Sequence, residues 1–294
     1  MTIKPIINIH TVVSLNSLKY FKYFINNHIK KSSNKSQLRF YAHCTDYQAF
    51  QELAKNNTVE VFDSFAHPKN FPSGSIRELL RKWKTFFKIS SKAAGSGGHL
   101  VGLNSIQNNL KKGEINIIAD ADTVMLFNKW DLEIIKLLNT YGVIGTPYED
   151  IGGFSSGNSI YQTYKQKPNV VWMAMSPKFP WNQLSLDHKK NINIKIINNK
   201  LSRLYNLPVG YELVRDVGWR IPSFLEDNNI PYKSFVQIKP TSQAVQVIKT
   251  GIDYHEEYHL DGIVFLAHQR GSNQHPFRGN KISKSFYDAC EGLL

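Results

Sequence analysis

The chain has few cysteines, no long apolar run and no P-loop. Only Cys44 and Cys290 occur among its 294 residues, which excludes a disulfide framework or a cysteine metal site. No stretch approaches the roughly 18 consecutive apolar residues of a membrane-spanning helix, and residues 1–9 do not have the pattern of a signal peptide. The glycine-rich stretch 95–98 lacks the Lys-Ser/Thr pair that completes a P-loop. We therefore expect a cytoplasmic protein with reduced thiols and no membrane span.

Acidic residues are also in the minority. The chain carries 36 Lys and Arg against 23 Asp and Glu, a formal net charge of +13. This excess favours polyanionic partners, among them nucleotides, nucleic acids, acidic glycans and membrane surfaces. A hydrophobic content of 41% with 12% aromatics excludes a disordered polymer. With no internal repeat and no low-complexity linker, the chain is predicted to form a single domain over residues 1–294.

The first half alternates apolar runs with helical patterns. Strands are predicted at 6–13, 38–44, 59–62, 115–120 and 141–147, and helices at 15–29, 46–54, 75–92, 100–110 and 130–138. Strands that alternate with helices predict an α/β fold with a parallel sheet covered on both faces. Beyond residue 148 the pattern becomes irregular. There we predict strands at 170–175, 234–238 and 262–266, an exposed basic excursion at 187–200 and a helix at 210–226.

The strand predicted at 115–120 ends in two carboxylates, Asp120 and Asp122, separated by Ala121. Residues two apart on an extended chain point to the same side, and ligands of such sheets bind beyond the carboxyl ends of the strands. Carboxylate oxygens are the ligands that Mg²⁺ and Mn²⁺ prefer. The pair therefore predicts a divalent-cation site. The alternative is a polar turn after a buried strand, where Asp is common.

Three features, in chain order, resemble the GT-A fold glycosyltransferases, the nucleotide-sugar enzymes of family 2 and their viral relatives. The first half is a βαβα arrangement. His99-Leu100-Val101-Gly102-Leu103-Asn104 resembles the helix before the metal strand of these enzymes, and Asp120-Ala121-Asp122 resembles their Asp-any-Asp motif, with Trp130-Asp131 after it. The similarity covers residues 5–150 well and 205–275 loosely.

The resemblance implies a Rossmann-like, mixed but mostly parallel sheet with helices on both faces. Residues 1–150 would form the nucleotide-sugar-binding half. Residues 151–294 would form an irregular half that binds the acceptor and completes the metal site. The implied enzyme is a hexosyltransferase-like glycosyltransferase that uses a UDP-sugar and Mn²⁺ or Mg²⁺. If it is viral, it would act in the host cytoplasm.

The resemblance also implies roles for individual residues. Asp122 would bind the metal directly, Asp120 would bind ribose or metal-bound water, and His268 would complete the metal site. The predicted nucleotide-sugar contacts come from the ends of the first two strands, from the helix before the metal strand, from the motif and from the C-terminal region: Thr11, Val13, Asp46, Asn104, Asp120, Ala121 and Arg270. Most of these residues have a structural alternative. Thr11, Val13 and Asp46 suit turn and cap chemistry, and Asp46 is a good helix N-cap. Asn104 would be an exposed amide, His268 a surface residue and Arg270 a salt-bridge partner.

A general base is needed only if transfer inverts the configuration of the sugar, because a carboxylate must then take the acceptor proton. The resemblance favours Asp216 in this role, with Glu149 and Asp150 as rivals. The structural alternative for Asp216 is a helix-surface ion pair with Arg215 or Arg220. The sequence does not assign the stereochemistry.

The acceptor is open between a glycan and a hydroxymethylated base in DNA, the DNA modification made by some phage enzymes. One alternative function is a nucleotidyltransferase that forms the sugar nucleotide, although residues 11–16 lack the basic glycine-rich loop expected after its first strand. Another is a non-enzymatic nucleic-acid-binding protein, favoured only by the charge. The sequence assigns neither the sugar nor the oligomeric state.

Overall fold

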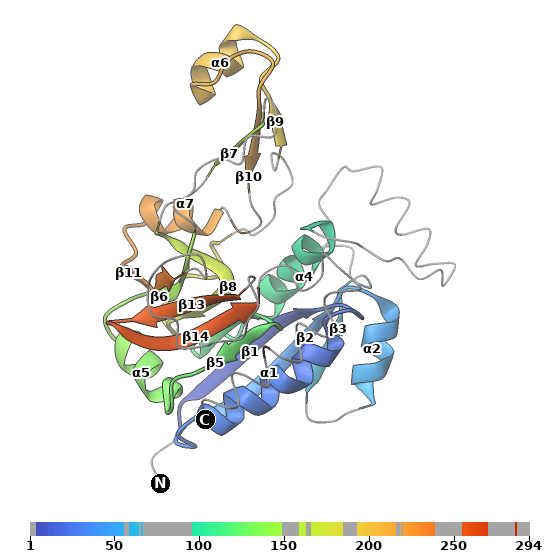
Figure 1. Cartoon of the computed structure of the whole chain (residues 1–294), viewed down its shortest axis with the longest axis vertical. Helices are drawn as coiled ribbons and strands as arrows, with labels where there is room; N and C mark the ends of the chain where they lie inside the picture. The colour runs from blue at the N-terminus through green and yellow to red at the C-terminus, as the bar shows by residue number, and fades with distance from the viewer. Residues whose placement is uncertain are drawn as a thin grey trace.

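The structure is a computed structural model that describes residues 4–55, 59–64, 66, 96–148, 159–162, 166–184, 193–215, 218, 220–238, 255–269 and 286. The described part is a mixed α/β fold built on a large central sheet, with a small sheet packed in front of it and a narrow arm above it (Figure 1). The predicted helix at 75–92 lies outside the described residues. Within them, no helix is long and apolar enough to cross a membrane.

The central sheet has seven strands in the order β11-β6-β8-β4-β1-β2-β3. Its strands are β1 (Ile6–Val13), β2 (Gln37–Cys44), β3 (Glu60–Asp63), β4 (Ile115–Asp120), β6 (Val143–Pro147), β8 (Pro168–Met175) and β11 (Tyr232–Ser234). All neighbouring pairs are parallel except those of β8, which runs antiparallel to both β4 and β6. The predicted fold class, a mixed and mostly parallel sheet flanked by helices, is confirmed.

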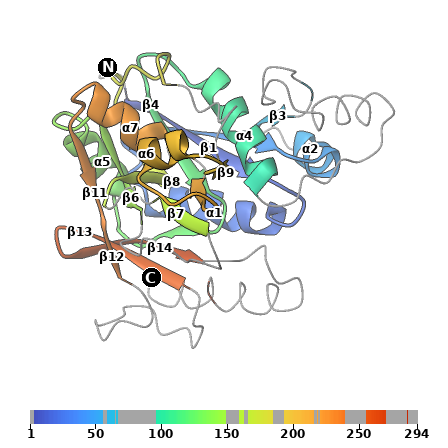
Figure 2. The ribbon, with the colours of Figure 1, turned by 90° about the horizontal axis from the view of Figure 1, so that it is seen from above.

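Helices and a second sheet cover the two faces of the central sheet. One face packs on α4 (Ser96–Asn109) and α7 (Arg220–Asp227). The other packs on α1 (Leu18–Lys31), on α5 (Trp130–Leu137) and on an antiparallel sheet. That sheet has the order β12-β13-β14-β5, from β12 (Val236–Ile238), β13 (His255–Leu260), β14 (Ile263–Gln269) and β5 (Thr123–Met125). Figure 2 shows α4 and α7 on one side of β1 and β8, with the small sheet on the other; α2 (Tyr47–Ala54) lies at the β3 edge.

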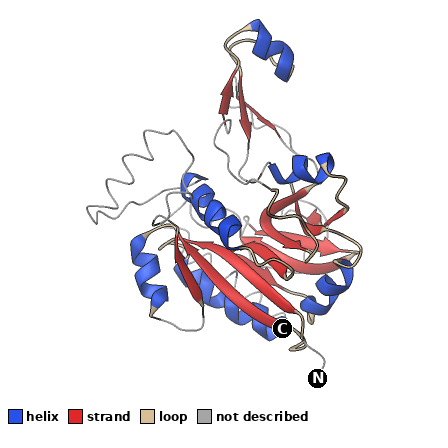
Figure 3. Ribbon diagram, turned by 180° about the vertical axis from the view of Figure 1, so that it is seen from behind, coloured by secondary structure: helices blue, strands red, loops and turns tan. Residues whose placement is uncertain are grey.

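The arm is a three-stranded sheet that carries a short helix away from the body (Figure 3). It consists of β7 (Ser159–Gln162), β9 (Asn193–Lys195), α6 (Asn199–Tyr205) and β10 (Glu212–Arg215). The predicted helix at 210–226 is therefore wrong in its first half, because residues 212–215 pair with β7 and β9. The chain becomes helical only after Gly218, whose φ of +89° interrupts it before α7.

Candidate metal centre

The end of β4 positions both carboxylates of the predicted motif. The last residue of β4 is Asp120, a tight turn follows, and Asp122 directly precedes β5. The hydroxyl of Thr123 donates to the backbone oxygen of Asp120 at 2.8 Å, which closes the turn. The two side chains keep partial access to solvent, with 25% of Asp120 and 13% of Asp122 exposed. The chain therefore leaves the buried sheet with two accessible carboxylates at its carboxyl edge.

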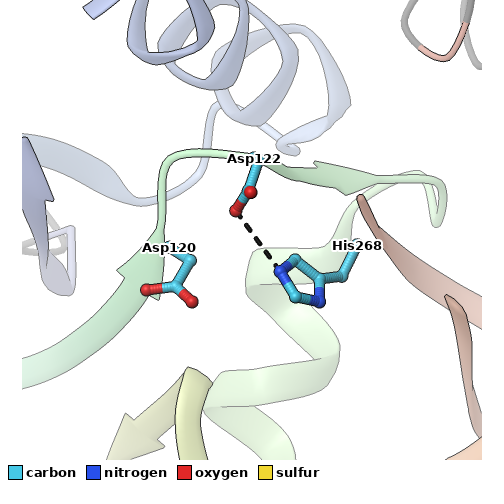
Figure 4. Close-up of side chains that lie close together, drawn as sticks. All are labelled: Asp120, Asp122 and His268. Atoms are coloured by element: carbon cyan, nitrogen blue, oxygen red, sulfur yellow. Dashed lines mark ion pairs between the residues drawn. The ribbon is translucent and has the colours of Figure 1, made fainter. Parts of the chain in front are cut away.

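The third member, His268, comes from β14. This strand pairs antiparallel with β5 and places His268 opposite Thr123, and the amide of Gln269 donates to the backbone oxygen of Asp122 at 3.1 Å. As a result, Nε2 of His268 lies 3.4 Å from Oδ1 of Asp122. Figure 4 shows the side chains of Asp120, Asp122 and His268 converging from two strands on one space. The structure thus brings together the three residues predicted to hold the cation.

The ligand set fits a divalent cation. One ligand atom from each of Asp120, Asp122 and His268 lies within 4.8 Å of the other two. Around an octahedral cation with bonds of about 2.1 Å, neighbouring ligands lie about 3 Å apart and opposite ligands slightly over 4 Å apart. Small side-chain rotations would bring the three atoms into this range. Two carboxylate oxygens and one imidazole suit Mn²⁺ or Mg²⁺ better than a thiolate-seeking metal.

A further carboxylate, that of Glu256, lies next to the ring nitrogen of His268 that does not face Asp122. Glu256, on β13, pairs with His268 in register, and its Oε2 lies 3.6 Å from Nδ1 of the imidazole. The hydroxyl of Tyr258 donates to the same Oε2 at 2.8 Å. Burial alone would lower the pKa of His268, but Asp122 and Glu256 on its two sides raise this pKa to about 10. Without a cation the imidazole is therefore protonated at neutral pH and is held between two negative charges.

A second histidine, His99, lies next to the carboxylate of Asp120. It lies in the first part of α4, and its Nε2 is 3.6 Å from Oδ1 of Asp120. The helix comes this close to the sheet because Gly102 lies on Val12, where a Cβ would be only 2.5 Å from Val12 Cγ1. Val12 is paired with Asp120 in the β1–β4 register. The packing of α4 on β1 therefore fixes the distance between His99 and the carboxylate.

The residues predicted to bind the nucleotide lie near the same edge. Thr11 and Val13 are fully buried in the last part of β1, and their nucleotide contacts stay predictions. Asp46 caps α2: its carboxylate accepts from the amide of Ala49 at 2.7 Å and from that of Leu15 at 2.6 Å. The cap chemistry of Asp46 is thus as the sequence indicates, and its nucleotide contact stays a prediction.

Two further predicted contacts are buried. Asn104, in α4, is 5% exposed, and Ala121, between the two carboxylates, is 4% exposed. The remaining predicted residues, Asp216 and Arg270, lie outside the described part of the chain, as do Glu149 and Asp150. Their roles stay predictions.

Comparison with known proteins finds only weak similarity, to solved structures. No family model and no curated protein matches the chain. Among solved structures, the galactosyltransferase LgtC in complex with donor and acceptor sugar analogues has a TM-score of 0.43 and 12% identity, covering 98% of this chain and 100% of that one. An active-site mutant of LgtC has a TM-score of 0.34 and 11% identity over 71% and 72% of the two chains.

A third solved structure, 4-diphosphocytidyl-2C-methyl-D-erythritol synthase from Anaerococcus prevotii, has a TM-score of 0.30 and 10% identity over 73% of this chain and 90% of that one. Similarities of this size carry no assignment of activity. The case for function therefore depends on the metal centre itself.

Three residues of this centre have no role in the sequence-based prediction: His99, Glu256 and Tyr258. His99 falls in the stretch that resembles the family, but nothing in that stretch indicates that it faces Asp120. Glu256 and Tyr258 lie on β13, which the prediction missed. The available signal was Asp261-Gly262, a dipeptide typical of two-residue hairpin turns, and both residues have positive φ, +50° and +81°.

Proposed function

We propose that the protein is a metal-dependent glycosyltransferase that moves a hexose from a UDP-sugar to a hydroxyl acceptor. The observation that supports this most directly is the cluster of Asp120, Asp122 and His268 at the carboxyl edge of a mixed α/β sheet. Ligands of such sheets bind at this edge. A cation held there would meet the diphosphate of a bound nucleotide sugar.

The chemistry requires a way to stabilise the nucleoside diphosphate as it leaves. A divalent cation supplies several kcal/mol of such stabilisation by neutralising the negative charge that develops on the leaving group. In the proposal Asp122 and His268 hold the cation, and Asp120 holds it or the ribose. Arg270, directly after β14, would add charge-assisted hydrogen bonds to the diphosphate.

The remaining predicted residues complete this assignment. Thr11, Val13 and Asp46 would border the base and ribose, while Asn104 and Ala121 would border the ribose or sugar. If transfer is inverting, Asp216 would take the proton from the acceptor hydroxyl. The proposed acceptor is a glycan or a hydroxymethylated base in DNA. The net charge of +13 is compatible with both.

Thermal unfolding tests the donor site. Because a ligand that binds only the folded state stabilises it by mass action, UDP should raise the melting temperature by a few degrees in the presence of Mn²⁺ and by less in its absence. Asp122→Ala should abolish the Mn²⁺-dependent part. The matched control is Asp261→Asn, an exposed carboxylate on the β13–β14 turn that pairs with Lys233. Equal shifts in both variants would remove Asp122 from the site.

Product analysis tests the reaction. The protein is incubated with UDP-sugars and Mn²⁺ in the presence of oligosaccharides or hydroxymethylated DNA, and the products are analysed by mass. A glycosyltransferase adds one hexose to the acceptor and releases UDP. In a parallel incubation with UTP and a sugar phosphate, a nucleotidyltransferase would instead form a sugar nucleotide and release pyrophosphate. A chain that does neither but binds DNA with a steep salt dependence would be a nucleic-acid-binding protein.

A further inference from the structure

The arm has a small core of its own. Ile196 and Leu213 are buried at 1% and 7% exposure, with Leu201, Leu207 and Tyr211 packed against them. Asn198 caps α6 by accepting from the amide of Leu201 at 3.0 Å. The end of the arm, residues 193–213, is thus a folded unit with a defined inside and outside.

Large apolar side chains nevertheless lie on the outside of this unit. Ile197 is 72% exposed, Leu204 68% and Val209 49%. Single exposed aliphatic residues are ordinary, but three within thirteen residues of a unit this small need a reason. The arm core does not use them, although it is built from their neighbours Ile196, Leu201 and Leu207. The exposure of these three side chains favours contact between the arm and a partner surface into which apolar side chains can insert.

The charges of the same segment are mostly positive. Lys195, Lys200 and Arg203 are all exposed, and residues 193–213 contain one acidic residue, Glu212, which lies opposite Lys195 on the neighbouring strand. Exposed aliphatic side chains beside basic residues form the pattern of interfacial segments, in which the apolar groups enter the headgroup boundary and the cations meet anionic lipids. Nucleic acid would account for the cations but not for the exposed Ile197 and Leu204.

We propose that the end of the arm docks on an anionic lipid surface. Ile197, Leu204 and Val209 enter the headgroup region, and the three cations contact acidic headgroups. Figure 1 shows α6 at the extremity of the molecule, beyond α7 and α4 and far from α1 and α5. Docking there holds the body above the surface without covering the metal centre of the central sheet. This proposal does not depend on the proposed glycosyltransferase activity.

Co-sedimentation of the full chain with vesicles tests the docking. The protein should bind vesicles that contain phosphatidylglycerol and should not bind pure phosphatidylcholine at physiological ionic strength. The double variants Ile197→Ser/Leu204→Ser and Lys200→Glu/Arg203→Glu should each weaken binding at least about tenfold. Since all the altered side chains are exposed, circular dichroism should show an unchanged melting temperature.

Two matched variants separate docking from general effects. Lys22→Glu/Lys30→Glu makes the same change in net charge on exposed positions of α1. Val236→Ser/Ile263→Ser removes apolar groups that are 60% and 53% exposed on the body. Both should bind vesicles as the unmodified chain does.

Three results would overturn the proposal. One is that the unmodified chain does not bind the anionic vesicles, and another is that the arm and body variants lose binding equally. The third is binding to duplex DNA that falls with Lys200→Glu/Arg203→Glu but is unaffected by Ile197→Ser/Leu204→Ser, with no vesicle binding. That result would assign the arm to nucleic acid.

Discussion

Asp122 and His268 face each other across two paired strands, with Oδ1 of the carboxylate 3.4 Å from Nε2 of the imidazole. They are far apart in the sequence, and their meeting depends on the pairing of β5 with β14, in which His268 lies opposite Thr123. A slip of one residue in this register would turn the imidazole to the other face of the sheet. The candidate metal centre therefore depends on the small antiparallel sheet as much as on the Asp120-Ala121-Asp122 sequence.

Metal binding at this centre should release a proton. Because Asp122 and Glu256 raise the pKa of His268 to about 10, the imidazole is charged at pH 7 and must lose its proton before it can bind a cation. Mn²⁺ affinity should therefore rise by roughly tenfold per pH unit between pH 7 and 9. Calorimetry in buffers of different ionisation enthalpy should show about one proton released per Mn²⁺ at pH 7.

The variant His268→Asn provides the control for this linkage. It removes the titrating group, so any remaining Mn²⁺ binding should lose most of its pH dependence over the same range. Glu256→Gln should have an intermediate effect, because it removes one of the two charges that raise the pKa of His268. If Mn²⁺ affinity of the unmodified chain is flat from pH 7 to 9, His268 is not a ligand.

His99 should act as a positioning residue for Asp120. Its Nε2 is 3.6 Å from Oδ1 of that carboxylate, and groups behind a ligand commonly change metal affinity by about 10- to 100-fold when removed. His99→Phe should weaken Mn²⁺ binding by about tenfold with little change in the free energy of unfolding. His99→Gln, which keeps a hydrogen-bond donor, should recover part of the affinity. Equal affinities in the Phe and Gln variants would contradict the assignment.

Gly102 is expected to set the distance of α4 from the sheet. A Cβ at this position would lie 2.5 Å and 2.7 Å from the two methyl carbons of Val12, and overpacking of this kind costs about 1–3 kcal/mol. Gly102→Ala should lower the free energy of unfolding by that amount and also weaken Mn²⁺ binding, because His99 moves with the helix. Urea denaturation and metal titration measure the two effects.

A double-mutant cycle isolates this contact. Val12→Ala removes the methyl groups that the new side chain would meet, so Gly102→Ala should cost less in the Val12→Ala background than alone. Additive costs would place the effect of Gly102→Ala in contacts other than the one with Val12, because the higher helix propensity of Ala would itself be stabilising.

The sequence predicted the central sheet well for a physical reason. The strands β1, β2 and β4 are buried on both faces, so their sequences are nearly continuous apolar runs. In the helices between them, apolar residues recur with the helical period of about 3.6 residues. The alternation of strands and helices also predicts which edge of the sheet holds the carboxyl ends of the strands, and therefore where Asp120 and Asp122 lie. His268 was added through the family resemblance and not through any local pattern.

The missed elements depend on tertiary pairing. Residues 212–215 carry a pattern compatible with a helix, but Leu213 packs on Ile196 within the arm, and the pairing with β7 and β9 decides the conformation. Likewise, His99 could not be placed from the sequence. Because α4 is buried at Leu100, Val101, Leu103 and Ile106 around most of its circumference, its pattern does not indicate which side meets β4.

Asp131 illustrates how an acidic residue next to the resembling motif serves the fold. Its fully buried carboxylate accepts from the amide of Ser33 at 2.8 Å, from the hydroxyl of Ser33 at 2.5 Å and from that of Ser36 at 2.6 Å. Asp131→Ala leaves three donors unpaired, so the free energy of unfolding should fall by about 3 kcal/mol or more. Mn²⁺ affinity of the folded fraction should not change, whereas Asp122→Ala should lose Mn²⁺ binding. Urea denaturation and Mn²⁺ titration of both variants would refute this division of roles if Asp131→Ala weakened metal binding at unchanged stability.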